Sequence, residues 1–386
     1  MPALLCRPGG TTPRNPPLAT RPRDFVTPPW PGAVAAEVSR AAVRIKGIVT
    51  PVTAVTARAP AKVNLQLAVG PAQAHGYHDL VTVYHAVSLF DEVTVAPAEQ
   101  DSVSVTGEGA DSVPADASNL AVRAVAELLR AVGAGAKDSP GLAIRINKRI
   151  PVAAGLAGGS ADAAAALVAC NELWRTGLSQ AELCELAASV GSDVAFGLVG
   201  GTAIGVGRGQ RVTPALAAGT YHWVLAFATS GLSTAQVYAA WDRMRAPHGG
   251  PDGSAAAPVK PASRARSGRT STAAPPGSPA LDNRLMAALR SGKPTEVGPL
   301  LANDLQQAAI SLRPDLRRTL AAGMEHGALA AIVSGSGPTC AYLAKDARHA
   351  ADLAVALAGA GVCRTVVHVA GPVPGAGVTG IAAEPK

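Results

Sequence analysis

The residues from 151 to 167 combine glycines with a hydroxyl group in a pattern that suits phosphate binding. Gly155, Gly158 and Gly159 precede Ser160, which opens an Ala-rich stretch of helical character. Glycines let backbone amides approach an anion, and the unpaired amides of a helix's first turn point toward it. The segment predicts either a phosphate-binding loop or a glycine-lined packing turn, with Ser160 as a helix cap or as a hydroxyl ligand for a phosphate-bound cation. It matches neither a Walker A loop nor a GxGxxG dinucleotide loop.

Two charged residues far from this segment are further candidates for chemistry. Lys62 and Asn64 lie on one face of a predicted strand that runs from Lys62 to Val69, because side chains two residues apart point the same way. Asp193 follows a glycine that ends a predicted helix. Its pattern fits an N-cap aspartate, and it also fits an active-site carboxylate near the glycine loop.

Regular elements on both sides of the loop are predicted to position it. An alternating strand at Leu142–Ile146 leads into the loop, and an amphipathic helix over Ser118–Val132 precedes that strand. The run Ser179-Gln180-Ala181-Glu182 is a capping box that opens a helix ending near Gly191. Asp193 is thereby expected close to the end of a helix that packs beside the loop.

The second half of the sequence predicts a further set of helices and strands. A second glycine-rich turn, Ser334–Thr339, lies between two short apolar runs. The remaining expected elements are strands at Leu80–Ser88, Glu92–Ala96, Ser102–Thr106, Gly200–Gly207, Tyr221–Phe227, Ala328–Val333, Cys340–Leu343 and Arg364–Ala370, with helices at Thr234–Met244, Asn283–Arg290, Leu312–His326 and Ala347–Ala358. Without long βαβ repetition, this order predicts an α+β, two-layer fold.

The net charge of +7 is concentrated in two low-complexity segments. Residues 1–48 carry a net charge of +5 and residues 246–280 a net charge of +3, which leaves the rest nearly neutral. Residues 1–50 predict a disordered extension, either a transit peptide or an upstream segment before a native start near Val49; residues 246–280 predict a disordered insertion. A basic face for nucleic acid is therefore not expected.

Composition also bounds the compartment. Five scattered cysteines form no CxxC pair, and no apolar run approaches the roughly 18 residues that a membrane span needs. These features predict a cytoplasmic protein with reduced cysteines, no membrane partner and no nucleic-acid partner.

Three sequence blocks resemble, in order and spacing, the motifs of the GHMP small-molecule kinases over residues 55–372. They are Pro60-Ala61-Lys62-Val63-Asn64, the run Pro151–Ser160 and the turn Ser334–Thr339. Within that superfamily, Gly76-Tyr77-His78-Asp79-Leu80 and Gly191-Ser192-Asp193-Val194 resemble the family that phosphorylates the C2 hydroxyl of 4-diphosphocytidyl-2-C-methyl-D-erythritol in non-mevalonate isoprenoid synthesis.

The resemblance implies a fold and its boundaries. A ribosomal-S5-like N-terminal domain would bind ATP over residues 51–215, and a ferredoxin-like C-terminal domain would span residues 216–372 and carry the insertion. Residues 373–386 would be a flexible tail, and the protein would be a monomer or a homodimer.

The resemblance also implies roles for single residues. Asp193 would deprotonate the substrate hydroxyl, and Lys62 would stabilise the charges at the reacting atoms. Asn64 would position the cytidyl diphosphate substrate, and Tyr77 and His78 would recognise its cytosine. ATP with Mg²⁺ would contact Pro151, Val152, Ala153, Ala154, Gly155, Leu156, Ala157, Gly158, Gly159, Ser160, Ala161 and Asp162, with Ser160 as the candidate Mg²⁺ ligand.

Some positions depart from the family pattern. Ala154 and Ala157 replace frequent glycines, so we expect neither position to need left-handed backbone geometry. Ala161 replaces a frequent serine, which puts more weight on Ser160, and Ala195 replaces a frequent proline. Residues 71–75 lack the basic side chains that would contact the substrate diphosphate.

Three alternatives remain open on the sequence. The chain could phosphorylate another alcohol of the homoserine or mevalonate type, although Tyr77 and His78 favour a substrate with a nucleobase. It could be a catalytically silent nucleotide-binding protein, against which the presence of both Lys62 and Asp193 argues. A nucleic-acid binder with basic tails would lose affinity steeply with added salt.

Overall fold

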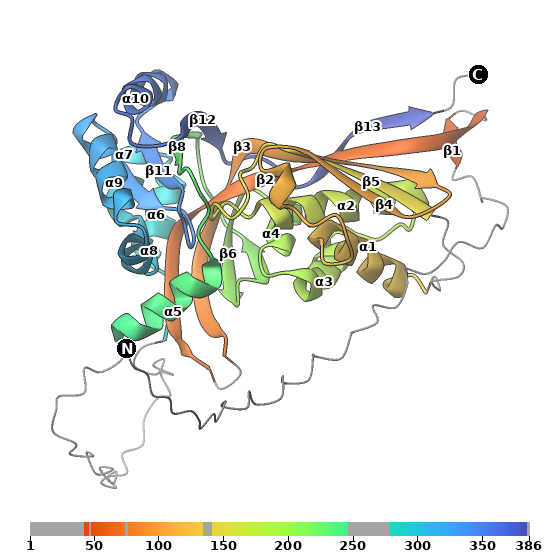
Figure 1. The fold of residues 1–386 in the computed structure, drawn as a ribbon, viewed down its shortest axis with the longest axis horizontal. Helices are drawn as coiled ribbons and strands as arrows, with labels where there is room; N and C mark the ends of the chain where they lie inside the picture. Colours follow the sequence, from red (N-terminus) through yellow and green to blue (C-terminus); the bar gives the residue numbers. More distant parts are fainter. Residues whose placement is uncertain (1–41, 46–47, 74–75, 134–140, 246–277, 384–386) are drawn as a thin grey trace, which may run out of the picture.

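The computed structural model describes residues 42–45, 48–73, 76–133, 141–245 and 278–383. Two β-sheets, each with helices packed against it, lie side by side, and the long strands β2 and β3 reach from the first sheet to the second (Figure 1). The insertion predicted at 246–280 lies almost entirely outside the described residues, as does the predicted N-terminal extension up to residue 41. Among the described helices, none has the length and apolar character to cross a lipid bilayer.

The first sheet carries the strands from which the candidate residues project. Its main path runs in the order β1-β2-β3-β5-β4, and β6, β7, β9 and β13 join at its sides. The bounds are β1 Ala42–Ile45, β2 Ile48–Ala72, β3 His78–Ala98, β4 Ser102–Gly107, β5 Gly141–Lys148, β6 Thr202–Gly207, β7 Arg211–Pro214, β9 Ala302–Asn303 and β13 Gly377–Ala383. The two strands expected at Leu80–Ser88 and Glu92–Ala96 are one long strand, β3.

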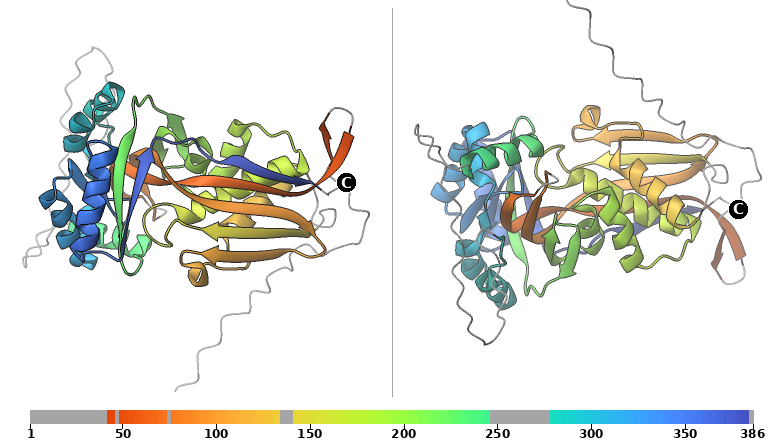
Figure 2. Two further views of the ribbon diagram at one scale, coloured as in Figure 1. Left: turned by 90° about the horizontal axis from the view of Figure 1, so that it is seen from above. Right: turned by 90° about the horizontal axis from the view of Figure 1, so that it is seen from below.

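Four helices cover one face of this sheet: α1 (Leu120–Ala131), α2 (Gly158–Trp174), α3 (Gln180–Val190) and α4 (Val194–Val199) (Figures 1 and 2). Helix α2 lies innermost against β2 and β3, and alanines on every side of it are buried. Small side chains allow a central helix to pack closely on all sides, which explains why the core is rich in Ala and Val. The capping box predicted at Ser179 is present at the start of α3, and Gly191 ends that helix.

The second sheet is antiparallel, in the order β10-β11-β8-β12. Its strands are β8 Tyr221–Phe227, β10 Ala330–Val333, β11 Cys340–Ala344 and β12 Thr365–Gly371, and the helices around it are α5 Thr234–Arg245, α6 Asn283–Ser291, α7 Pro294–Val297, α8 Gln306–Leu312, α9 Asp315–Glu325 and α10 Ala347–Gly359. Val224 and Ala226 face α9 and α10, whereas Trp223 and Leu225 join the core of the first sheet. The α+β prediction is confirmed.

Two sequence predictions about the ends of the fold are wrong. Residues 377–383 were expected in a flexible tail, but they form β13, which pairs with residues 52–58 of β2. Residues 42–45 and 48–50 were expected to be disordered, but β1 and the start of β2 form an antiparallel hairpin. In both cases the partner strand supplies the order, and local composition carries no signal of a partner.

Helix α8 is also absent from the sequence prediction. The helix expected at Leu312–His326 begins only at Asp315, after Pro314, and a separate short helix precedes it. Strand β9, just before α8, pairs in parallel with residues 66–67 of β2. Within the described residues beyond β8, two strands therefore return to the first sheet, β9 and β13.

Candidate active site

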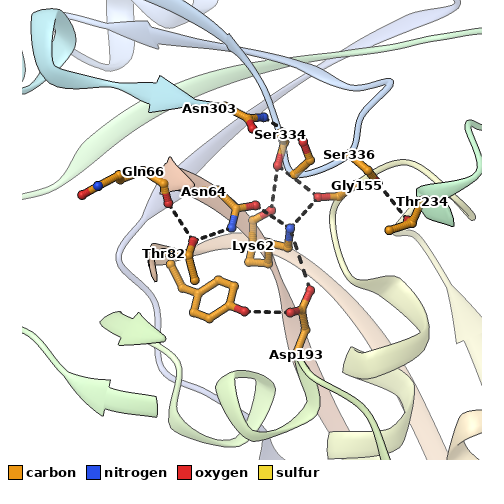
Figure 3. Close-up of polar contacts among 12 residues, drawn as sticks. Lys62, Asn64, Gln66, Thr82, Gly155, Asp193, Thr234, Asn303, Ser334 and Ser336 are labelled. Atoms are coloured by element: carbon orange, nitrogen blue, oxygen red, sulfur yellow. Dashed lines mark hydrogen bonds and ion pairs between the residues drawn. The ribbon is translucent and has the colours of Figure 1, made fainter. Parts of the chain in front are cut away.

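The three sequence blocks that carry the resemblance converge on one cavity of about 880 Å³ between the two sheets. Lys62 lies on β2, the glycine loop precedes α2, and the turn Ser334–Thr339 connects β10 to β11 (Figure 3). Backbone hydrogen bonds tie the blocks together, since Lys62 N–H donates to the Leu156 carbonyl and Thr339 N–H to the Ala154 carbonyl. The convergence makes this cavity the candidate active site.

Lys62 is the centre of the polar network in Figure 3. Its ammonium donates to Asn64 Oδ1 at 2.6 Å and to the Gly155 carbonyl at 2.8 Å. Its side chain is only 6% exposed, and its Nζ lies 3.9 Å from Asp193 Oδ2. Burial lowers the pKa of Lys62, and the Asp193 charge opposes that shift. The strand prediction was right that Lys62 and Asn64 share a face, but this face is buried.

Asp193 lines the candidate active site. It occupies the N-cap position of α4, yet its side chain makes no capping hydrogen bond. Instead, Oδ1 accepts a hydrogen bond from the Tyr84 hydroxyl at 2.8 Å, and Oδ2 faces Lys62. Of the two readings of its sequence context, the geometry favours the functional one.

The glycine loop presents the start of α2 to the cavity. Gly155, Gly158, Gly159 and Ser160 all line it. The N-cap residue of α2 is Ala157, which has no side chain that could cap the first-turn amides. Those amides are therefore available to an anion at this end of the cavity.

The backbone of the loop corrects one prediction. Ala157 was expected to avoid left-handed geometry, but its φ is +61°, and φ of Ala153 is +50°. Ala154, by contrast, is not among the described residues with positive φ, so the expectation for that position is confirmed. A positive φ at alanine is sterically unfavourable, so a local sequence gives no reason to expect one there.

This strain leads to a stability prediction. Ala157→Gly should raise the free energy of unfolding by about 1 kcal/mol, because glycine adopts a positive φ without a steric penalty. As a control, Ala161→Gly inside α2 should lower it by about 1 kcal/mol. Denaturant unfolding of both variants measures the difference, and a destabilised Ala157→Gly protein would contradict the proposed strain.

Tyr77 and His78 both line the cavity. The side chain of Tyr77 is 55% exposed, and Arg208 lies over its ring at 5.0 Å from the centroid. His78 is buried and stacks on Tyr238 with 5.1 Å between ring centroids. Its Nδ1 lies 2.9 Å from the Gly70 carbonyl oxygen, and its Nε2 lies 3.3 Å from Asp242 Oδ2.

Several cavity residues were not singled out from the sequence. Residues 71–75 contain no Lys or Arg, but Arg208, in the turn between β6 and β7, brings a basic side chain to the cavity. Thr234 on α5 hydrogen-bonds Ser336 of the second glycine-rich turn at 2.8 Å. Tyr84, Tyr238 and Asp242 complete the set. Thr234 and Tyr238 stand in the run 232–238, which also resembles the family pattern, but neither received a role from the sequence. Tyr84, Arg208 and Asp242 belong to an ordinary strand, turn and helix, so only tertiary contact reveals them.

Asp162 differs from the other loop residues because it is buried behind the loop. Its Oδ2 accepts from Lys148 Nζ at 2.8 Å, and Lys148 also pairs with Asp91. Two carboxylates share one ammonium, and burial raises the pKa of Asp162 to about 7. Among the described residues, Asp162 Oδ1 has no hydrogen-bond partner, and Asp162 lines a second cavity of about 230 Å³ together with Gly158 and Gly159 of the loop.

A pH dependence follows from this buried group. Between about pH 4 and pH 7 the folded protein keeps a proton on Asp162 that the unfolded chain has released, so the free energy of unfolding falls as pH rises through this window. Asp162→Asn removes the effect. We expect the Tm difference, variant minus wild type, to be larger at pH 8 than at pH 5.

Asp352→Asn, on an exposed part of α10, is the control and should show the same Tm difference from wild type at both pH values. A constant difference for Asp162→Asn as well would rule out a protonated Asp162 in the folded protein.

Comparison with known proteins agrees with this geometry. Residues 119–203 match the GHMP kinases N-terminal domain, and residues 285–363 match the GHMP kinases C-terminal domain. The chain is 52% identical over 328 residues to 4-diphosphocytidyl-2-C-methyl-D-erythritol kinase of Mycolicibacterium gilvum. The aligned region covers 85% of this chain and 94% of that protein. It is 52% identical over 326 residues to the kinase of the same name from Nocardia farcinica, covering 84% and 96%.

Solved structures show the same relationship. A crystal structure of 4-(cytidine 5'-diphospho)-2C-methyl-D-erythritol kinase superposes with a TM-score of 0.60 at 30% identity, over 82% of this chain and 98% of that one. Homoserine kinase from Cytophaga hutchinsonii shares the fold, with a TM-score of 0.57 at 19% identity over 85% and 98% of the two chains. The chain therefore belongs to the 4-diphosphocytidyl-2-C-methyl-D-erythritol kinase family of GHMP small-molecule kinases.

Proposed function

We propose that this kinase transfers the γ-phosphoryl group of ATP to the C2 hydroxyl of 4-diphosphocytidyl-2-C-methyl-D-erythritol in non-mevalonate isoprenoid synthesis. The observation that carries the proposal is a single cavity that joins Lys62, Asp193 and the glycine loop to Tyr77 and His78. The names of the similar kinases support the choice of substrate.

In this proposal Asp193 is the general base. Its Oδ2 accepts the proton of the substrate hydroxyl as that oxygen attacks phosphorus. The Lys62 ammonium is held by Asn64 and Gly155, and it stabilises negative charge on Asp193 and on the reacting oxygens. Positioning and charge stabilisation supply most of the catalysis in phosphoryl transfer, and these residues provide both.

The loop residues fit a nucleotide triphosphate. Amides of Gly158, Gly159 and Ser160 at the start of α2 would hold its phosphates, and the Ser160 hydroxyl is the candidate Mg²⁺ ligand. When bound, ATP with Mg²⁺ supplies the phosphoryl group and neutralises charge on the leaving oxygens. The second cavity would take the nucleoside end, because the polar residues Asn119 and Asp162 line it and it shares Gly158 and Gly159 with the main cavity.

The far end of the main cavity fits the cytidyl diphosphate. Tyr77, which is 55% exposed, offers an aromatic ring for stacking, and Arg208 beside it offers a cation for a diphosphate. Both ring nitrogens of His78 already have partners, Gly70 and Asp242. Its role in cytosine recognition would therefore be smaller than the sequence alone predicts. Asn64 is bonded to Lys62 and Thr82, so its proposed role is to orient the lysine as well as the substrate.

The remaining features of the proposal concern the whole chain. We assign residues 51–215 to the ATP-binding domain and residues 216–372 to the C-terminal domain, with β9 and β13 crossing back to the first sheet. The enzyme would work in the cytoplasm on a small molecule, as a monomer or homodimer and without a nucleic-acid partner.

An acceptor panel tests the substrate. ADP release should be fast with 4-diphosphocytidyl-2-C-methyl-D-erythritol and near background with homoserine, with mevalonate and with the same polyol phosphate lacking its cytidyl group. Comparable rates with the truncated polyol phosphate would exclude a nucleobase-binding role for the Tyr77 side of the cavity. A preference for homoserine or mevalonate would establish the alternative kinase.

A further inference from the structure

The two carboxylate oxygens of Asp193 have different surroundings. Oδ1 accepts a hydrogen bond from the Tyr84 hydroxyl at 2.8 Å. Oδ2 lies 3.9 Å from Lys62 Nζ and is not the oxygen that Tyr84 contacts. Asp193 is the N-cap residue of α4, but its carboxylate does not hydrogen-bond the first-turn amides of that helix. Rotation of this carboxylate is therefore restrained at Oδ1.

Tyr84 is itself held firmly. It lies on β3 between Asn64 of β2 and Ala203 of β6, and its side chain is 2% exposed. Its ring stacks on Phe196 of α4 with 4.7 Å between centroids and an interplanar angle of 26°. Phe196 follows Asp193 by three residues, so the ring contact and the hydrogen bond fix the same end of α4.

Two glycines make room for this ring. A Cβ atom on Gly205 would lie 2.5 Å from Tyr84 Cε2, and one on Gly209 would lie 2.3 Å from the Tyr84 hydroxyl oxygen. Both distances are far below contact distance, so the chain is shaped closely around the phenol. The position of the hydroxyl is set by backbone on one side and by Asp193 on the other.

We propose that Tyr84 is a positioning residue that holds Asp193 Oδ1, so that Oδ2 faces the substrate hydroxyl. This inference deepens the proposed function and rests on the assignment of Asp193 as the base. Burial, with the Asp193 charge and hydrogen bond, raises the pKa of Tyr84, so the hydroxyl stays protonated and acts as a donor. A base fixed in orientation loses less entropy on reaching the transition state.

Tyr84→Phe is the test, because phenylalanine keeps the ring on Phe196 and removes only the hydroxyl. Because a hydrogen bond to a charged group is stronger than one between neutral groups, we expect its loss to lower kcat roughly tenfold. KM for ATP and for the alcohol should stay within about twofold, since Tyr84 acts through Asp193. The matched control is Tyr221→Phe, which removes a buried hydroxyl bonded to the Leu289 carbonyl at 3.2 Å and should leave kcat unchanged.

A double-mutant cycle separates positioning from structural support. In the Asp193→Asn background, Tyr84→Phe should cause little further loss, because the oxygen that it orients is no longer a base. An equal tenfold loss in both backgrounds, or an unchanged kcat in Tyr84→Phe alone, would overturn the inference. If Asp193→Asn itself retains wild-type turnover, the base assignment fails instead, so the two failures are distinguishable.

Discussion

Asp193→Asn is expected to lower kcat by about 100-fold or more, as is typical when a general base is lost. Asparagine keeps the size of the side chain but cannot accept the substrate proton. Because the Asp193 side chain makes no helix-capping hydrogen bond, the fold should persist, and we expect nucleotide binding to persist with it. Steady-state ADP release measures kcat, and calorimetry with a non-hydrolysable ATP analogue measures nucleotide affinity.

The control for this prediction is Glu185→Gln, which removes an exposed carboxylate on the preceding helix α3. Its kcat and its affinity for the analogue should match wild type. Wild-type turnover in Asp193→Asn would remove this residue from the mechanism. A parallel loss of analogue binding would show instead that Asp193 supports the loop.

Gly155→Ala is expected to disrupt the junction on which the site is built. Gly155 has a φ of +77°, and a Cβ atom there would lie 2.1 Å from the Ser334 carbonyl oxygen and 2.9 Å from Gly337 N. These are backbone atoms of the second glycine-rich turn, so they cannot move aside as a side chain would. We expect the free energy of unfolding to fall by at least about 2 kcal/mol.

The same change should also reduce catalysis. The Gly155 carbonyl accepts hydrogen bonds from Lys62 Nζ at 2.8 Å and from Ser334 Oγ at 3.1 Å. A loop pushed away from the turn carries this acceptor with it, and misplacement of about 1 Å can cost about 100-fold in rate. Turnover of the folded fraction should therefore fall at least tenfold.

Gly177→Ala is the matched control for the backbone effect. Gly177 has a similar φ of +71°, but no atom of the described residues, its two chain neighbours aside, lies within 4 Å of the position that a Cβ would occupy. It should lose about 1 kcal/mol of stability with normal turnover. If Gly155→Ala behaves like Gly177→Ala, the close approach of the two loops is not needed for the site.

Much of this site could be recognised from local sequence. A glycine loop between a strand and an Ala-rich helix has few physical interpretations, and the capping box at Ser179 placed the helix before Asp193 correctly. The alternation from Lys62 to Val69 correctly put Lys62 and Asn64 on one face. These features depend on neighbours in sequence, so the sequence suffices for them.

The sequence alone did not decide how Asp193 is used. An N-cap and an active-site base have the same local pattern, and the difference lies in Tyr84 and Lys62, which are more than 100 residues away. The same limit explains the missed strand β13, whose order comes from pairing with β2, and the positive φ of Ala157, which the local sequence does not indicate.

What the sequence by itself determined is the set of parts: a glycine-rich loop, a lysine, a carboxylate, and a tyrosine–histidine pair. Only the tertiary structure decided that β2, β3 and the turn between β10 and β11 bring these parts to one cavity, and that Tyr84 contacts one oxygen of Asp193 while Lys62 faces the other. The physical reason is that chemistry at a site depends on distances between side chains. Long-range packing of the two sheets fixes those distances, and no local pattern encodes them.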